Sequence, residues 1–464
     1  MKIRLIYSFV LLFSSASPLF AQNNLAGASI GFVLTDLATG ENLISQNSNM
    51  CLTPASINKL ITTAAALEIL GADFRFKTDF SYSGNITDSV LNGNLYIVGG
   101  GDPTLCSKYF DNSDFSEQLC NILKANKITQ INGDIIVDAS IFDKEPIPSG
   151  WSWNDIGNYY AAGIYGLSIF DNTTNITFST LNSTPEITNI SPQVQGLVIE
   201  NNLIAKKGVG DSAYFYGRPY ENFRQVFGAI EKDRDAFLLK ADIPNPPLVT
   251  AQYVVAVLGK NGIKVKGKAT DVLEENQTKT LLYQHFSEPL STVLLLTNYH
   301  SNNNFTEHIL KYLSLQTSEE GNFEGGIKVV KQFWKSKELN TETLFMLDGS
   351  GLSPHNAVCV NFLNDVLIYM AKESKNSEVF FQSLPVAGVS GTVHNFLKNT
   401  ELQDKVHLKS GSIARVQCYA GYIVDNEKKY SFVIMVNNFS GKRKEIVKEI
   451  ENKIINAIEQ CVKS

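Results

Sequence analysis

A long polar stretch rich in β-strand signals separates two segments in which strands alternate with helices. Residues 78–283 contain short β-like runs between Asn and Gly turns, whereas residues 22–77 and 284–464 contain apolar runs of strand and helix length. The 464 residues exceed the size of one ordinary domain. We therefore expect an α+β fold in which one domain, made from both ends of the chain, is interrupted by inserted β-rich domains.

The two outer segments have the pattern of an antiparallel sheet with helices. Residues 29–36 and 42–45 predict one pair of strands, and residues 417–424 and 430–436 predict a second pair. A helix is expected over residues 54–70, where the near absence of polar positions indicates burial on most sides. Further helices are expected at residues 113–125, 289–296, 304–315 and 442–462.

The N-terminus has the layout of a secretory signal peptide. Lys2 and Arg4 precede an apolar run at residues 5–13, and small residues lead to Ala21, after which cleavage is expected. A membrane anchor is the alternative, but the apolar run is short for a bilayer span and no later segment is long enough. We expect residues 1–21 to be removed and the mature chain to be periplasmic, soluble or loosely associated with the membrane, without a transmembrane anchor.

Charge and cysteine content limit the classes of partner, metal site and disulfide that can be expected. The net charge of −6 and the pI of about 5.7 favour neither nucleic acid nor an anionic membrane. No Cys-x-x-Cys or His-x-x-x-His spacing occurs, so no metal site is expected. Of the six cysteines, Cys106 and Cys120 are closest in sequence and are the best candidates for a disulfide, with buried free thiols as the alternative.

A Ser-x-x-Lys sequence lies at the predicted start of a helix, with Ser56 and Lys59 at its ends. Residues three apart share a helix face, so the Lys59 amine can lie against the Ser56 hydroxyl. A serine hydroxyl becomes a good nucleophile only when a base takes its proton, and burial lowers the pKa of a lysine toward the range that this requires. Ser-x-x-Lys also occurs by chance in many proteins, so the motif is weak alone.

A Ser-x-Asn sequence precedes the predicted helix at residues 304–315. The hydroxyl of Ser301 can relay a proton in this position, and the side-chain amide of Asn303 can orient a substrate. An N-cap for the following helix is the alternative reading of these residues.

A Lys-Ser-Gly sequence precedes the predicted strand at residues 417–424. Lys409 and Ser410 offer a cation and a hydroxyl for a substrate carboxylate, and Gly411 allows a peptide backbone to approach closely. The backbone N–H of Ser412 can bind an oxyanion opposite that of Ser56. A plain turn is the alternative.

The order of the three motifs is more informative than any one of them. Ser-x-x-Lys, Ser-x-Asn and Lys-Ser-Gly follow the signature of penicillin-binding proteins and serine β-lactamases. The chain resembles the class C low-molecular-mass penicillin-binding proteins, the D-alanyl-D-alanine carboxypeptidase/endopeptidase family, which carries two extra domains between the first two motifs. Further stretches that match this family are GGGDP at 99–103, GDIIVD at 133–138, WNDIGNYY at 153–160, DGSGLS at 348–353 and LPVAG at 384–388.

The resemblance implies a fold and an activity. The fold is a penicillin-binding/serine β-lactamase-like transpeptidase domain, an antiparallel sheet with helices, interrupted by a large β-rich two-domain insertion. The activity is that of a serine DD-carboxypeptidase and DD-endopeptidase that cleaves the stem peptides of peptidoglycan and is covalently inhibited by β-lactam antibiotics. Neither a metal nor an organic cofactor is expected.

The resemblance also implies a role for each motif. Ser56 attacks the carbonyl of the penultimate D-Ala, and Lys59 acts as the base. Ser301 helps to protonate the leaving amine, while Lys409 and Ser410 hold the terminal carboxylate.

Two positions depart from the family pattern. Ser410 replaces the usual threonine but keeps the hydroxyl, and Pro354 occupies a position where relatives often carry an arginine that holds the carboxylate of the stem-peptide side chain. Asp155 and Tyr160 match the family's side-chain pocket and remain. Arg415, three residues past Ser412, is a candidate substitute for the missing cation.

Two other functions are compatible with these motifs. A β-lactamase or esterase would use the same nucleophile but would release penicillin quickly. A non-catalytic protein that binds the cell wall or senses penicillin belongs to a different class, and the intact motifs argue against it.

Overall fold

The computed structural model describes residues 25–111, 114–273, 278–425 and 428–463. The predicted signal peptide lies outside these residues. A five-stranded antiparallel sheet joins the two ends of the chain, because the first strand pairs along its length with the last one. In spatial order its strands are β2 (Asn42–Gln46), β1 (Ser29–Asp36), β23 (Lys428–Asn437), β22 (Val416–Asp425) and β21 (Val406–Ile413).

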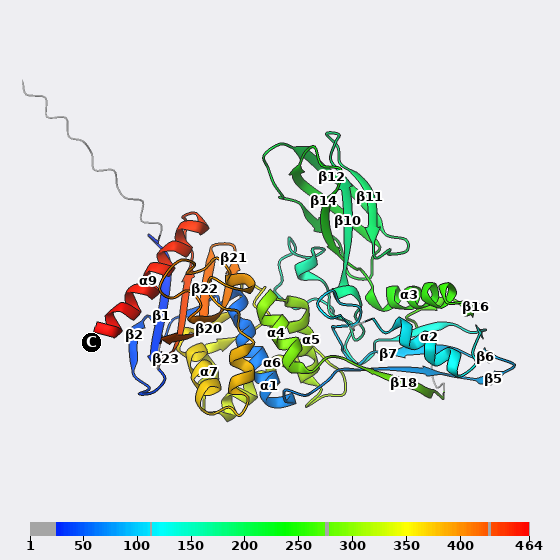
Figure 1. The fold of residues 1–464 in the computed structure, drawn as a ribbon, viewed down its shortest axis with the longest axis horizontal. Coiled ribbons are helices and arrows are strands. Elements are labelled where there is room, and N and C mark those ends of the chain that lie inside the picture. The colour runs from blue at the N-terminus through cyan, green and yellow to red at the C-terminus, as the bar shows by residue number, and fades with distance from the viewer. Residues whose placement is uncertain (1–24, 112–113, 274–277, 426–427, 464) are drawn as a thin grey trace, which may run out of the picture.

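Each face of this sheet is covered by helices (Figure 1). On one face the C-terminal helix α9 (Arg443–Lys463) packs its isoleucine stripe against alternate residues of the strands, such as Phe32 and Leu34. On the other face Val33 and Val433 join a core built from α1, which is buried on nearly all sides as its sequence predicts. The helices of that layer are α1 (Lys59–Leu70), α4 (Leu290–His300), α5 (Asn303–Ser314), α6 (Phe323–Ser336), α7 (Val360–Lys372) and α8 (Ser377–Gln382).

A small sheet beside this layer links distant parts of the chain. In it, β3, just before Ser56, pairs with β20, just after the Asp348–Ser353 stretch. The strands are β19 (Leu344–Phe345), β20 (Ala357–Cys359) and β3 (Cys51–Leu52).

The middle of the chain forms a second core of its own, around Phe80, Ile97 and Leu123. Two sheets and two helices surround that core. One sheet has the order β17 (Ala269–Thr270), β9 (Ile135–Asp138), β7 (Leu95–Val98), β4 (Lys77–Tyr82), β18 (Thr280–Phe286). The other has the order β16 (Lys264–Val265), β8 (Gln130–Ile131), β6 (Val90–Asn92), β5 (Asn85–Thr87), and the helices are α2 (Ser116–Ala125) and α3 (Pro246–Lys260).

A β-sandwich projects from this region (Figure 1). Its two three-stranded sheets enclose a separate core that contains Phe178, Phe215 and Val226. One sheet has the order β11 (Glu186–Ser191), β10 (Thr173–Ser179), β15 (Phe237–Asp242), and the other has the order β12 (Val198–Lys206), β14 (Phe223–Glu231), β13 (Tyr214–Tyr216).

The structure corrects one sequence prediction about the cysteines. Cys106 and Cys120 are not bridged: both are free thiols, Cys120 is buried in α2, and the Sγ atom of Cys106 lies 3.7 Å from Oδ1 of Asp114. The close spacing in sequence was misleading because the turn at 106–111 and the helix that follows direct the two side chains to different neighbours. Among the described residues, no helix has both the length and the apolar character needed to cross a membrane.

Candidate active site

Ser56 lies in a short 3-10 turn, Ala55–Asn58, that leads directly into α1. Ala55 is fully buried and has a φ of 47°, an unfavourable conformation for a residue with a Cβ atom. The α-helix begins at Lys59 rather than at Pro54, so Ser56 precedes the regular helix by one turn. This turn places the side chains of Ser56 and Lys59 on the same side of the backbone, within hydrogen-bond distance of each other.

Lys59 contacts residues from three stretches that the sequence singled out: its own Ser-x-x-Lys motif, the Ser-x-Asn motif and the DGSGLS stretch at 348–353. Its Nζ donates to Oγ of Ser56 at 3.1 Å, to Oδ1 of Asn303 at 2.6 Å and to the carbonyl oxygen of Ser350 at 2.8 Å. The side chain is fully buried. All three hydrogens of a protonated amine therefore have acceptors, and loss of one proton leaves a lone pair that can accept from the Ser56 hydroxyl.

Burial lowers the pKa of Lys59 to about 7, although the nearby carboxyl groups of Glu307 and Asp348 act in the opposite direction. Burial and the charge of Asp348 raise the pKa of Glu307 to about 8. The Glu307 carboxyl group accepts from the backbone N–H groups of Gly349 at 3.0 Å and Ser350 at 2.7 Å. Glu307 thereby fixes the loop whose carbonyl group holds Lys59.

A second buried lysine lies close by. Nζ of Lys409 donates to Oγ of Ser301 at 2.8 Å and to the carbonyl oxygen of Ser410 at 2.7 Å. Burial, together with the charge of Lys59, lowers the pKa of Lys409 well below its usual value. Ser301 has a φ of 56° and ends α4, so it is held in the loop between α4 and α5 rather than acting as an N-cap. Asn302 is the residue that caps α5.

The Lys-Ser-Gly motif lies on β21, at one edge of the five-stranded sheet. A Cβ atom on Gly411 would lie 2.6 Å from the Pro54 carbonyl oxygen and 3.0 Å from the Ser56 backbone nitrogen, so only glycine fits. Ser412 is exposed immediately beyond it. The Ser410 hydroxyl lies 2.8 Å from that of Thr392.

Asp155 and Tyr160 are linked to Lys59 through hydrogen bonds that involve Asn303. Nδ2 of Asn303 donates to the carbonyl oxygen of Tyr160 at 2.8 Å, and the Tyr160 hydroxyl donates to Oδ1 of Asp155 at 3.0 Å. Arg415 is not brought to the site, because its guanidinium group donates to the carbonyl oxygens of Asn438 and Phe439. Its φ of 57° in the turn after β21 directs the side chain toward the end of β23.

Two lysines, two serines and an asparagine from three separate parts of the chain thus converge on one point, and comparison with known proteins assigns the family. A family model described as D-Ala-D-Ala carboxypeptidase 3 (S13) matches residues 14–460. The chain belongs to this family. The predicted resemblance and the predicted enzyme class, a serine-type D-Ala-D-Ala carboxypeptidase, are confirmed.

Individual relatives agree with this assignment. The D-alanyl-D-alanine carboxypeptidase of an Actinomadura species is 29% identical over 90% of this chain and 79% of its own length. The crystal structure of penicillin-binding protein 4 from Haemophilus influenzae has a TM-score of 0.81 at 26% identity, and the match covers 93% of this chain and 96% of that one. A second structure of that protein, complexed with a novel β-lactam, has a TM-score of 0.74 at 24% identity over the same shares of the two chains. The predicted α+β penicillin-binding fold is confirmed.

Sequence reasoning found the family's three motifs and the stretch at 348–353, but it did not predict how Asp348 and Glu307 support them. Asp348 is fully buried and accepts from Trp151 Nε1 at 2.9 Å and from the Ser353 backbone N–H at 2.6 Å. Glu307 follows Asn303 by four residues on α5, and this same-face spacing was the available signal for it. In the parts of the chain that the structure describes, no group of three His, Cys, Asp or Glu side chains is arranged to hold a metal ion.

Proposed function

We propose that Ser56 is the nucleophile of this S13 peptidase and that Lys59 is the base that activates it. The observation that carries the proposal is the buried Lys59 amine, which contacts both the Ser56 hydroxyl at 3.1 Å and the Asn303 amide oxygen at 2.6 Å. With a pKa of about 7, this lysine is partly neutral at neutral pH and can take the Ser56 proton.

The remaining residues complete an acyl transfer. The backbone N–H groups of Ser56 and Ser412 hold the oxyanion that forms when Ser56 attacks the penultimate D-Ala carbonyl. Ser301, hydrogen-bonded to Lys409, delivers a proton to the leaving amine. Lys409 and Ser410 bind the terminal carboxylate, and water then releases the acyl group from Ser56.

The substrates we propose are the D-Ala-containing stem peptides of peptidoglycan, cut both at their ends and at cross-links. β-Lactam antibiotics acylate the same serine as covalent inhibitors. Asp155 and Tyr160 border the pocket for the side chain of the stem peptide, supported by the link from Tyr160 to Asn303. Pro354 leaves that pocket without the arginine found in relatives, so a neutral or amidated side chain suits it better than a free carboxylate.

We further infer that residues 22–77 and 284–464 form one catalytic domain, with 78–283 inserted. The pairing of β1 with β23 supports this division. The signal-peptide pattern at residues 1–21 supports export to the periplasm. N-terminal sequencing of protein recovered from the cell envelope tests the export: a mature chain that starts at Gln22 is expected, and an intact Met1 in that material contradicts it.

Covalent labelling with a fluorescent penicillin tests the nucleophile. The wild-type protein should form a stable adduct whose modified peptide contains Ser56, and Ser56→Ala should abolish the label. Ser336→Ala, which removes an exposed hydroxyl from the end of α6, is the matched control and should label normally. Undiminished labelling of Ser56→Ala would overturn the assignment, and release of the label within seconds would indicate a β-lactamase.

A further inference from the structure

The projecting β-sandwich carries an exposed cluster of aromatic side chains. Residues alternate along β13 and β14, so that Phe215 and Val226 face the core while Tyr214, Tyr216 and Phe227 face outward. The Tyr216 ring lies 5.2 Å from that of Tyr214 and 5.9 Å from that of Phe227, measured between ring centroids.

Trp153 extends this cluster toward the active site. Its side chain is 56% exposed, and its ring stacks on that of Tyr216 with a centroid distance of 6.2 Å and an interplanar angle of 12°. We call Trp153, Tyr214, Tyr216 and Phe227 the aromatic platform. Tyr214 is 39% exposed, so the platform presents Trp153 and Tyr214 to solvent, with Tyr216 in contact with both.

A short chain of contacts connects the platform to Lys59. The Tyr216 hydroxyl donates to Oδ1 of Asn154 at 3.3 Å, next to Asp155. Asp155 accepts from Tyr160, whose carbonyl oxygen accepts from Asn303, the partner of Lys59. These contacts link the platform to the residues proposed to bind the stem peptide.

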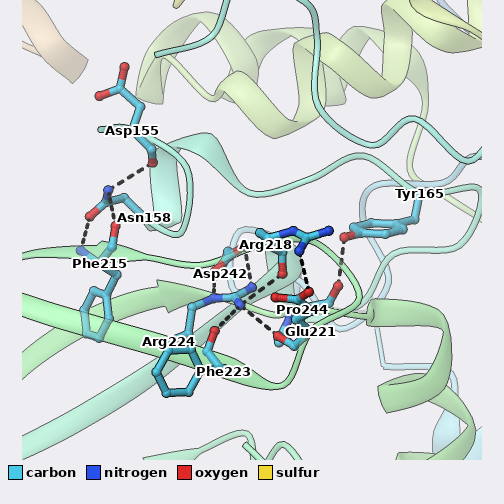
Figure 2. Close-up of polar contacts among 10 residues, drawn as sticks. All are labelled: Asp155, Asn158, Tyr165, Phe215, Arg218, Glu221, Phe223, Arg224, Asp242 and Pro244. Carbon is cyan, nitrogen blue, oxygen red and sulfur yellow. Dashed lines mark hydrogen bonds and ion pairs between the residues drawn. The ribbon is translucent and has the colours of Figure 1, made fainter. Parts of the chain in front are cut away.

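The side chain of Asn158 links the loop that carries Asp155 to strand β13 at Phe215 (Figure 2). The Asn158 side chain donates to the carbonyl oxygens of Asp155 at 3.0 Å and Phe215 at 3.1 Å, and it accepts from the Phe215 backbone N–H at 2.9 Å. Asn158 is 4% exposed, so water does not compete for these bonds. Asn158 therefore ties the loop that carries Asp155 to β13, the strand that carries Tyr214 and Tyr216.

Polar groups border the aromatic rings. Glu200 accepts from Asn202 at 3.0 Å and from Gln225 at 3.1 Å on the outward face of the same sheet. Aromatic rings with amide and carboxyl groups at their rim match a pyranose ring, which has apolar C–H faces and a hydroxyl-bearing edge. The carboxylate of Glu200 at this rim disfavours an anionic polymer.

We propose that the aromatic platform binds the glycan strand of peptidoglycan and thereby presents its attached stem peptides to Ser56. The inference rests on the proposed function, because stem peptides reach the enzyme while they are joined to amino-sugar chains. A sugar ring stacked on Trp153 would place its peptide beside the Asp155 pocket. The platform would act on binding of polymeric substrate and not on the chemistry of bond cleavage.

Sugar binding can be measured without catalysis. The chain has three tryptophans, and Trp151 and Trp334 are at most 7% exposed, so a solvent-sensitive change in fluorescence reports on Trp153. The tetramer of β-1,4-linked N-acetylglucosamine should alter this fluorescence in both wild-type protein and Ser56→Ala. Tyr214→Ala keeps the Trp153 reporter and should weaken binding by about tenfold, whereas Trp153→Ala removes the reporter and is tested by kinetics instead. Absence of any binding by the wild-type protein would overturn the proposal.

Kinetics on two substrates provide the second test. For pentapeptides attached to purified glycan strands, Trp153→Ala and Tyr214→Ala should lower kcat/KM for D-Ala release by about tenfold through KM. For the same pentapeptide free in solution, both variants should stay within about twofold of wild type. Phe286→Ala, which removes a 51% exposed aromatic ring at the end of β18, is the control and should leave both substrates unaffected.

The outcomes separate the two proposals. Equal losses on free and glycan-linked peptide would show that the platform contacts the peptide or a structural neighbour, and would overturn glycan binding. If the proposed function were wrong, the wild-type protein would cleave neither substrate, and the fluorescence titration alone would then decide whether the platform binds sugar.

Discussion

Two glycines, Gly351 and Gly411, approach the backbone next to Ser56 so closely that neither position has room for a Cβ atom. A Cβ atom on Gly351 would lie 1.9 Å from the Ala55 carbonyl oxygen, and one on Gly411 would lie 2.6 Å from that of Pro54. Ala55 is itself held at a positive φ of 47°. Two glycines from distant parts of the chain thus clamp the turn that presents the nucleophile.

Gly411→Ala should therefore impair acylation strongly. The added methyl group must push β21 away from Ser56, and displacement of a reacting group by even about 1 Å costs on the order of a hundredfold in rate. We expect penicillin acylation to slow by at least about tenfold while the folded protein remains. Gly259→Ala, where nothing lies within 4 Å of the new methyl group, is the control and should acylate at the wild-type rate. Equal rates for the two variants would contradict the clamp.

Lys59 gives the reaction a defined dependence on pH. Burial lowers its pKa to about 7, so the neutral, base-competent form increases as the pH rises through that value. The rate of acylation by penicillin should fall by nearly tenfold for each pH unit well below about 7 and level off above about 8. Lys335→Met, at an exposed lysine of α6, should keep this profile, and Lys59→Met should lose nearly all activity. A flat wild-type profile between pH 6 and 8 would exclude Lys59 as the base.

At the scale of single residues, the sequence predicts the catalytic motifs better than it predicts the residues that pack around them. Lys59 was placed against Ser56 because three-residue spacing on one turn is a local property. Glu307 and Asp348 act through contacts that form only when α5 and the loop before β20 pack against α1. Arg415 was misjudged because its closeness to Ser412 in sequence says nothing about the turn that points it away.

Helix α5 is the element that unites the site with the inserted region. Asn303 at its start faces Lys59, while His308, fully buried, contacts Ser168 of the inserted region with Nε2 and Oγ 2.6 Å apart. Nδ1 of His308 lies 2.8 Å from the Asn304 carbonyl oxygen, which fixes it as the protonated nitrogen of a neutral ring. One helix therefore serves both the chemistry and the attachment of the inserted region.

His308 should make stability fall in mild acid. Burial lowers its pKa to about 4, so between about pH 6.5 and 4 the unfolded chain binds a proton that the folded protein does not. Stability contributed by the neutral ring is present above this window and is lost as the pH falls through it. Between pH 7 and 5 the apparent free energy of unfolding in urea should fall by about 2 kcal/mol more for wild type than for His308→Gln. The same pH dependence in both proteins would contradict this assignment.

Elements with strong periodicity were predicted closely. The strand at residues 29–36 coincides with β1, and the isoleucine stripe located α9. An edge strand was expected at Lys-Ser-Gly, but the bounds of β21 were not predicted, because this run also resembles a turn and its strand form depends on pairing with β22. Helix α3 was not predicted within the β-rich middle of the chain. Its apolar residues do not form one clear stripe, and it packs against β9 and β17.

At the scale of the whole molecule, the sandwich depends on a charge pair inside its own sheets. Arg224 and Asp242 are at most 2% exposed and form two hydrogen bonds, of 2.6 and 2.9 Å (Figure 2). The Arg224 Nη1 atom also donates to the carbonyl oxygens of Arg218 and Glu221. These bonds tie β14 to β15 across the sandwich.

Removal of the Asp242 charge should lower the local stability of the β-sandwich. Asp242→Asn leaves a buried guanidinium group without its counter-charge, which typically costs about 3–5 kcal/mol. Amide hydrogens of β10, β14 and β15 should then exchange about two to four orders of magnitude faster. Glu221→Gln removes the partner from an exposed pair with Arg218 and should change these rates by less than about threefold. Unchanged exchange in Asp242→Asn would show that the pair is dispensable.

The pairing of β1 with β23 also sets an order of events for the newborn chain. A polypeptide that emerges N-terminus first presents β1 long before its neighbour on that side exists, and until then only β2 is available to it. The strands from β4 to β18 find all of their partners among themselves, so that part can complete its hydrogen bonds earlier. Ser56, the proposed nucleophile, is thus among the first residues made, but the sheet that supports it closes among the last. A chain truncated before β23 would contain Ser56, Lys59 and the β21–β22 pair that carries Lys409, but it would lack the strand that joins β22 to β1. The sheet would then not hold Lys409 beside Ser56, and we expect no acylation.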